Sequence, residues 1–114
     1  MPAVAELSYS CTLAEASLNH SNDMALVDFF SHTGSDGLSA GDRISNLGYS
    51  FQAWGENISA GQDSVSQVMQ GWLNSPGHCQ NIMQSIYTEM GGARTDTTTA
   101  TYSNYWTVVF AKPR

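Results

Sequence analysis

Residues 64–79 read SVSQVMQGWLNSPGHC and contain one helix, its end and the start of the next. Four apolar side chains recur in this stretch at i, i+3, i+4 and i+7, the spacing of one face of an α-helix. They are Val65, Val68, Met69 and Trp72. With Ser64 or Asp63 as its N-cap, the pattern predicts a helix over 65–72 that places Trp72 in the core.

Pro76 ends this helix and begins another. Ser75 can cap the new helix, and Pro76 is favourable at its first position because the N–H that proline lacks would have no partner there. His78 therefore falls in the first helical turn, where its side chain can face a cleft.

A long helix is predicted over residues 12–30, which contain no Gly or Pro and carry apolar residues at steps of three and four. Ser10 or Thr12 can serve as its N-cap. The polar turn 32–37 ends it, so His32 lies just past the helix end.

A second, short helix is predicted over residues 40–47. Ser39 is its N-cap, Asp42 follows at the capping-box position, and Gly48 can adopt the left-handed conformation that ends a helix.

Strands are concentrated later in the chain. Residues 89–94 and 105–111 predict two strands, joined as a hairpin by the polar loop 95–104. Residues 49–61 are too polar for a core strand and predict a short extended piece. Helices first and strands later, without regular alternation, indicate an α+β layer fold.

Composition indicates one domain with an acidic surface. The chain has 114 residues, 41% hydrophobic and 12% charged, and a formal net charge of −6, and its length is typical of a single domain. The four basic residues are scattered at Arg43, Arg94, Lys112 and Arg114, which argues against nucleic acid as a partner. We expect no transmembrane segment, because no apolar run approaches about 20 residues, and no signal-peptide pattern opens the sequence.

Two cysteines, Cys11 and Cys79, could be free thiols in a cytosolic protein or one bridge in an exported one. The low charge content and the Ser/Thr/Asn/Gly-rich surface favour the exported protein. We therefore predict a Cys11–Cys79 disulfide, which would stabilise the fold by about 4 kcal/mol on the chain-entropy model.

Three residues are candidates for chemistry. His32 and His78 lie at element boundaries, and Glu56 lies on a polar, glycine-flanked segment between them. Two histidines and a glutamate can bind zinc with water in the fourth position, or form a hydrogen-bonded cluster without metal. Their spacing leaves both possibilities open.

Other candidates have simpler interpretations. Cys79 follows His78, but adjacent helical residues point about 100° apart, which disfavours a nucleophilic cysteine. His20 is interpreted as a partly buried helix histidine held by a neighbour such as Asp23. Trp54, next to Gly55 and Glu56, is a candidate wall of a ligand groove.

Four segments, in matching order and spacing over nearly the whole chain, resemble the bacterial form of the CAP superfamily, which comprises the cysteine-rich secretory proteins, antigen 5 and plant pathogenesis-related proteins. The segments are HSNDMA (20–25) leading to FFSHTGSDG (29–37), GENI (55–58), WLNSPGHCQNI (72–82) and YWTVVF (105–110).

The resemblance implies a three-layer α-β-α sandwich with a central, mostly antiparallel sheet and a large cleft. In the family this cleft is lined by two His and two Glu, and the His pair sometimes holds zinc. Carried over by position, these residues are His32, Glu56 and His78. The fourth position departs from the eukaryotic pattern, because Ser75 stands where those members have a Glu.

The resemblance also implies a secreted, non-catalytic protein that binds a lipid, sterol or glycan, or a protein partner. One alternative is a zinc-dependent hydrolase or protease with His32 and His78 as ligands and Glu56 as general base. A second is a structural extracellular module. A lipid binder needs an apolar groove of several hundred Å³, which we expect away from the His cluster, and zinc held by the two histidines should be released below about pH 6.

Overall fold

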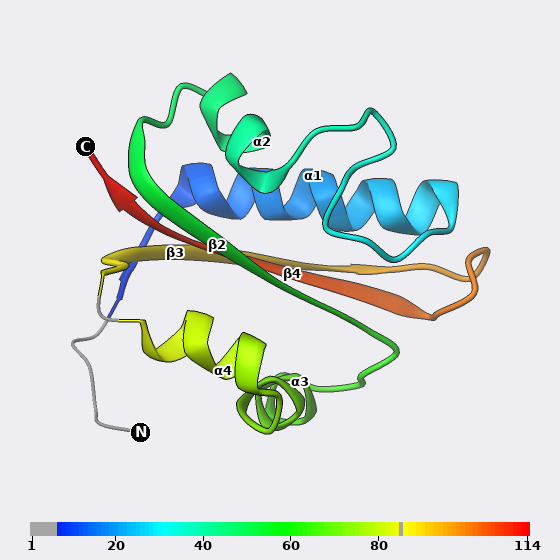
Figure 1. Ribbon diagram of the computed structural model, residues 1–114. Helices are drawn as coiled ribbons and strands as arrows, with labels where there is room; N and C mark the ends of the chain where they lie inside the picture. Colours follow the sequence, from blue (N-terminus) through cyan, green and yellow to red (C-terminus); the bar gives the residue numbers. More distant parts are fainter. Residues whose placement is uncertain (1–6, 85) are drawn as a thin grey trace.

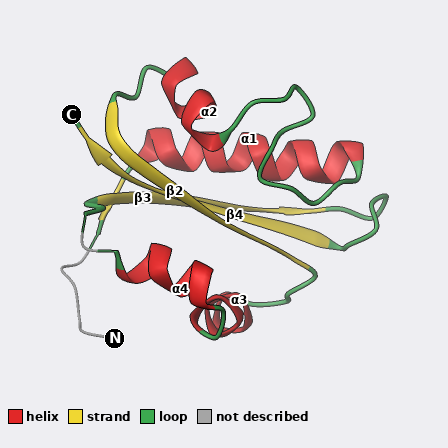
Figure 2. Ribbon diagram, in the orientation of Figure 1, coloured by secondary structure: helices red, strands yellow, loops and turns green. Residues whose placement is uncertain are grey.

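The computed structural model describes residues 7–84 and 86–114 and places a four-stranded sheet between two layers of helices (Figure 1). In chain order its elements are β1 (Ser8–Tyr9), α1 (Cys11–Val27), α2 (Ala40–Asn46), β2 (Phe51–Ala60), α3 (Val65–Leu73), α4 (Pro76–Met83), β3 (Glu89–Asp96) and β4 (Asn104–Pro113). Helices α1 and α2 cover one face of the sheet, and α3 and α4 cover the other (Figure 2). The predicted α+β class and α-β-α layering are confirmed.

The sheet is mostly antiparallel, as expected. Its strand order is β1-β3-β4-β2, with β4 antiparallel to both β2 and β3. The predicted hairpin is the β3–β4 pair, whose strands run further than expected and leave residues 97–103 as the loop. The short strand β1, which the sequence does not predict, pairs in parallel with β3.

The prediction of only a short extended piece over 49–61 is wrong. Strand β2 is ten residues long and pairs with β4 from Phe51 to Ala60. Its middle is buried even though Glu56 and Asn57 are polar. Buried polar groups are tolerated when they have hydrogen-bond partners, and Asn57 has two, donating to the His78 carbonyl (3.2 Å) and accepting from the Asn81 amide (2.9 Å).

Helix α1 ends earlier than its periodicity predicts, at Val27 and not near Phe30. Asp28 adopts a left-handed conformation (φ 60°), and its N–H bonds to the Met24 carbonyl. The Asp28 carboxylate accepts hydrogen bonds from the backbone N–H (2.8 Å) and the hydroxyl (2.9 Å) of Thr101, in the β3–β4 loop. A tertiary contact therefore accompanies the end of the helix, and local periodicity could not reveal it.

Serine side chains cap the first three helices. The Oγ atoms of Ser10, Ser39 and Ser64 each accept a hydrogen bond from a backbone N–H in the first turn. Ser39 and Asp42 form the predicted capping box, and Gly48 has the predicted left-handed conformation (φ 87°). These local predictions are confirmed.

Both faces of the sheet carry a core. Leu13 of α1 and Ile44 of α2 pack with Val109 of β4 on one face. On the other face, Trp72 of α3 packs with Trp106 of β4. The Trp72 side chain is buried, and its indole N–H donates to the Ile58 carbonyl (3.0 Å), which confirms that Trp72 is a core residue.

The predicted disulfide is wrong for this structure: no bridge joins Cys11 and Cys79, both of which it describes. Cys11 is exposed at the first residue of α1, and Cys79 is buried within α4. These helices cover opposite faces of the sheet (Figure 1), an arrangement that spacing along the chain cannot reveal. Because the structure has no such bridge, the cysteines give no support for export.

Candidate functional site

The buried carboxylate of Glu56 is the centre of the candidate site. Its side chain is 1% exposed. His32 Nδ1 lies 2.8 Å from Oε1, and Arg43 Nη2 donates to Oε2 at 2.6 Å. Strand β2 supplies the carboxylate, the loop after α1 supplies the imidazole, and α2 supplies the guanidinium. Because a buried charge is stable only when paired, Arg43 is the counter-ion that allows Glu56 to lie inside the sheet layer.

Sequence reasoning missed Arg43. It appears there as one of four scattered basic residues, but the structure shows a side chain only 10% exposed. The guanidinium also donates to the carbonyls of Leu38 (3.0 Å) and His32 (3.3 Å). It therefore ties α2 to the loop that carries His32. No local signal marks this role, because the partner of Arg43 comes from a strand 13 residues away.

The second histidine, His78, lies in the first turn of α4, as predicted. Its Nδ1 is 2.9 Å from Ser75 Oγ, and its ring stacks on Trp72 with centroids 6.5 Å apart. Burial lowers the pKa of His78, and the charge of nearby His32 lowers it further. Protonation of His78 is therefore disfavoured, and its Nδ1 is engaged by Ser75. Ser75 is the N-cap residue of α4 but makes no side-chain cap bond.

A cavity of about 270 Å³ opens beside His78. Ser75 and His78 line one side of it, and Trp72 extends the wall along α3. Two partly exposed aromatic residues, Phe30 and Tyr102, complete the rim, with ring centroids 6.4 Å apart. The structure thus brings Ser75 and His78 to one cavity, whereas His32, whose side chain is 58% exposed, pairs with the buried Glu56 beside it.

Trp54 does not line this cavity. Its indole covers Gly41 on α2, where a side chain would collide with the ring, and its carbonyl accepts a hydrogen bond from Tyr87 (2.9 Å). Trp54 therefore has a packing role between β2 and α2.

His20 is buried, as its helical position suggested, but its partner differs from the predicted one. Its Nε2 lies 2.7 Å from the Ser31 carbonyl, and Asp23 instead accepts hydrogen bonds from Ser35. Burial lowers the pKa of His20, and the nearby Arg43 charge lowers it further.

The donor set does not fit a catalytic zinc site. Hydrogen bonds occupy Nδ1 of both His32 and His78, which leaves two Nε2 atoms as potential ligands. Both oxygens of Glu56 are also engaged. Within residues 7–84 and 86–114 no three His, Cys, Asp or Glu side chains are grouped to hold a metal, whereas a catalytic zinc site uses three protein ligands.

An apolar groove of about 300 Å³ lies on the other side of α3. Helix α3 contributes Val65 and Met69, strand β3 contributes Met90 and Ala93, and strand β4 contributes Val108. Trp72 belongs to both hollows, so α3 is the wall between the His78 cavity and this groove.

Gly92 leaves room in the groove. A methyl group at this position would lie 3.0 Å from Val108 Cγ2. At one end of the groove the Arg94 guanidinium lies 4.9 Å from the centroid of the Trp106 ring. The groove is therefore apolar apart from the Arg94 guanidinium, whose charge is paired with Asp96 at 2.6 Å.

The model of the CAP family, described as the cysteine-rich secretory protein family, matches residues 3–110. The chain belongs to the CAP family. This confirms the resemblance read from the four sequence segments, and solved bacterial domains of the family confirm the fold.

Two relatives of this CAP domain are proteins of Bacillus subtilis (strain 168). The chain is 35% identical over 88 residues to the uncharacterized membrane protein YlbC and 34% identical over 80 residues to the uncharacterized protein YkwD. These matches cover 77% and 70% of this chain but only 25% and 31% of the relatives. The CAP chain thus spans about a quarter to a third of their length. No helix in the described part of this chain is long and apolar enough to cross a membrane.

Solved structures agree with the CAP assignment. An extracellular protein containing an SCP domain, from Bacillus anthracis str. Ames, superposes with a TM-score of 0.84 at 30% identity, covering 96% of this chain and 34% of that one. An outer surface protein from Borrelia burgdorferi superposes with a TM-score of 0.88 at 24% identity, covering 97% of this chain and 80% of that one. The latter likeness shows the fold alone.

Proposed function

We propose that this CAP domain belongs to an exported protein and acts as a non-catalytic binding module that holds an apolar ligand, a lipid chain or a sterol, in the groove between α3 and the sheet. The observation that carries the proposal is the groove itself, which is lined by apolar side chains of one helix and two strands and is separated from the His78 cavity by α3. Its volume is at the lower end of the range for small-molecule sites, about 300–1,000 Å³.

The electrostatics of the cleft support binding over hydrolysis. A general base needs a carboxylate oxygen within reach of the water it activates, and both oxygens of Glu56 already accept hydrogen bonds. Arg43 is the counter-ion of the buried Glu56. If Glu56 gave up this contact to act as a base, both charges would be left buried and unpaired, which is costly. Glu56 is therefore a structural anion in this proposal.

Export is part of the proposal and has its support in a relative. The Bacillus anthracis protein, which is 30% identical to this chain, is described as extracellular. The Ser/Thr-rich, weakly charged composition of this chain agrees with the same environment.

The test is a titration of the purified chain with cis-parinaric acid and, in parallel, with the fluorescent sterol dehydroergosterol. We expect saturable binding of at least one probe, with energy transfer from Trp72 and Trp106, which line the groove. The variant Met69→Glu places a charge in the groove and should weaken binding at least tenfold. Its matched control is Leu18→Glu, a partly exposed apolar residue of α1 on the other helical layer.

Thermal melting checks that both variants fold. Equal losses of binding in the two variants, or saturable binding of neither probe, would contradict the lipid assignment. Saturable binding that Met69→Glu leaves unchanged would place the probe outside the apolar groove and would also contradict the proposal.

A further inference from the structure

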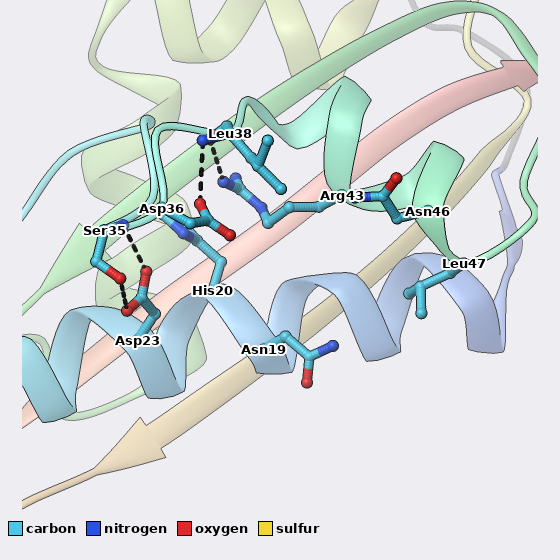
Figure 3. Close-up of a pocket in the computed structure, with 9 residues that line it drawn as sticks. All are labelled: Asn19, His20, Asp23, Ser35, Asp36, Leu38, Arg43, Asn46 and Leu47. Carbon is cyan, nitrogen blue, oxygen red and sulfur yellow. Dashed lines mark hydrogen bonds between the residues drawn. The ribbon is translucent and has the colours of Figure 1, made fainter.

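A third hollow, of about 330 Å³, lies between α1, α2 and the 34–38 loop (Figure 3). Helix α1 contributes Asn19 and His20, and α2 contributes Arg43 and Asn46. Asp36 of the loop forms part of its outer wall. We refer to it as the α1–α2 pocket. It shares Arg43 with the Glu56 cluster but shares no lining residue with the His78 cavity or the apolar groove.

Two buried atoms beside this pocket have no hydrogen-bond partner among the described residues: His20 Nδ1 and Arg43 Nε. The Nε2 of His20 faces the Ser31 carbonyl at 2.7 Å, so it carries the proton and Nδ1 is a bare acceptor. Arg43 Nε is a donor by its chemistry. Each unsatisfied buried group costs about 1–3 kcal/mol. A hydroxyl group can satisfy both, because it accepts one hydrogen bond and donates another.

The pocket also carries excess negative charge. A methyl group at Gly34 would lie 2.8 Å from Asp36 Oδ1, 3.3 Å from Asp23 Oδ2 and 3.5 Å from Arg43 Nη1, so these three charged groups converge there. The Arg43 charge is already paired with Glu56 at 2.6 Å. The two aspartates are thus left without a full counter-charge, and the pocket favours a cation.

The side chains around the pocket favour an organic cation over a metal ion. The His, Cys, Asp and Glu side chains of residues 7–84 and 86–114 include no group of three that could hold a metal ion. Amide groups of Asn19 and Asn46 add donors and acceptors around the pocket, while Leu38 and Leu47 supply apolar contact. A ligand for this wall needs an ammonium group and several hydroxyl groups on a compact apolar frame.

We propose that the α1–α2 pocket binds an amino sugar. Its ammonium group lies against Asp36 and Asp23, and one hydroxyl group bridges Arg43 Nε–H and His20 Nδ1. Residues 35–37 are exposed, so the Asp36 carboxylate is open to solvent, and the proposal requires the 34–38 loop to move outward for the hydroxyl group to reach the two buried atoms. The site is independent of the apolar groove proposed above.

The test is a titration of the ¹⁵N-labelled full chain, followed by amide chemical shifts, with three probes. Glucosamine has both the ammonium group and the hydroxyl groups, N-acetylglucosamine lacks the ammonium group, and cyclohexylamine lacks the hydroxyl groups. We expect saturable shifts at Ser35 and Asn46 with glucosamine, and at least tenfold weaker binding of the other two probes.

Substitutions locate the site. Asp36→Asn should weaken glucosamine binding at least tenfold, because it removes an exposed rim carboxylate without disturbing the core. Asp63→Asn, another exposed aspartate, is the matched control and should have no effect. Met69→Glu should also leave glucosamine binding unchanged, so failure of the lipid proposal and failure of this one are distinguishable.

Three outcomes would overturn the proposal: no saturable shift with millimolar glucosamine, equal affinity for cyclohexylamine, or unchanged affinity in Asp36→Asn. Equal affinity for cyclohexylamine would mean that the hydroxyl groups contribute nothing and that the pocket attracts any cation.

Discussion

The Glu56 and Asp96 carboxylates show how burial changes the value of an ion pair. Each lies 2.6 Å from an arginine nitrogen, but the Glu56 side chain is 1% exposed and the Asp96 side chain is 69% exposed. Removing one partner of a buried pair leaves an uncompensated charge, whereas water screens an exposed pair.

We therefore predict that Glu56→Gln lowers the free energy of unfolding by about 3–5 kcal/mol, because it leaves Arg43 buried without its counter-ion. Asp96→Asn, the same chemical change at an exposed pair, should cost less than about 1 kcal/mol. Urea denaturation of both variants measures the difference. Similar small losses in the two variants would show that the Glu56 pair is not a buried one.

At the two histidines, the hydrogen bonds of the structure lead to a prediction about zinc. His32 and His78 offer two Nε2 atoms and no third protein ligand, so we expect binding weaker than micromolar when chelator-stripped protein is titrated with zinc at pH 7.5 by calorimetry. A His32→Ala, His78→Ala double variant is the control for adventitious sites. Micromolar or tighter one-to-one binding that the double variant loses would reinstate the metal site and the hydrolase alternative.

At the scale of elements, the sheet and α1 approach each other most closely at Gly91. A Cβ atom at this position of β3 would overlap the backbone N of Ala14 and would lie 2.6 Å from the Ser10 carbonyl. Backbone cannot move aside as a flexible side chain can, so glycine is required here by close packing and not by its dihedral angles.

Gly91→Ala should therefore lower the free energy of unfolding by about 3 kcal/mol or more, through displacement of α1 from β3. Gly71→Ala is the matched control, because its added methyl group meets nothing within 4 Å on the exposed side of α3. Alanine favours helix over glycine, so the control should be neutral or stabilising by up to about 1 kcal/mol. Denaturant unfolding of the two variants measures the difference. A Gly91→Ala variant as stable as the unmodified protein would contradict the close packing of α1 on β3.

At the scale of the whole molecule, stability should depend on pH through the buried His20 and the partly buried His78. Burial lowers the pKa of His20 and of His78 below the ordinary value of 6.5. As pH falls below about 6.5, the unfolded chain takes up protons that the folded chain still refuses, so the free energy of unfolding decreases. Each histidine adds at most about 1.4 kcal/mol per pH unit to this decrease in the free energy of unfolding.

Chemical denaturation at pH 7.5 and pH 5.5 measures this decrease in the free energy of unfolding. In His20→Gln and in His78→Gln, the decrease between the two pH values should be smaller than in the unmodified protein. Stability that is unchanged or higher at pH 5.5 would contradict the lowered pKa values of these two imidazoles. Below pH 4, hydrogen bonds that lower the pKa of Asp28 and Asp42 add a second loss, since depressed carboxyl pKa values stabilise the fold only while the groups stay ionised.

The sequence by itself determined the features that depend on neighbours along the chain. Residues 65–72 form a helix because their apolar spacing matches one helical face, and Ser39 with Asp42 makes a capping box because the two residues are three apart. The same local patterns put His32 past a helix end and His78 in a first helical turn, and four segments in register predicted the family and its layered fold.

Only the tertiary structure decided the features that depend on partners brought together by folding. Strand β2 tolerates Glu56 because Arg43 and His32 arrive from other elements, α1 stops where Asp28 meets Thr101, and Cys11 and Cys79 are kept apart by the sheet. In each case the deciding energy belongs to a pair of groups that are distant in sequence, and periodicity, propensity and spacing contain no information about such pairs.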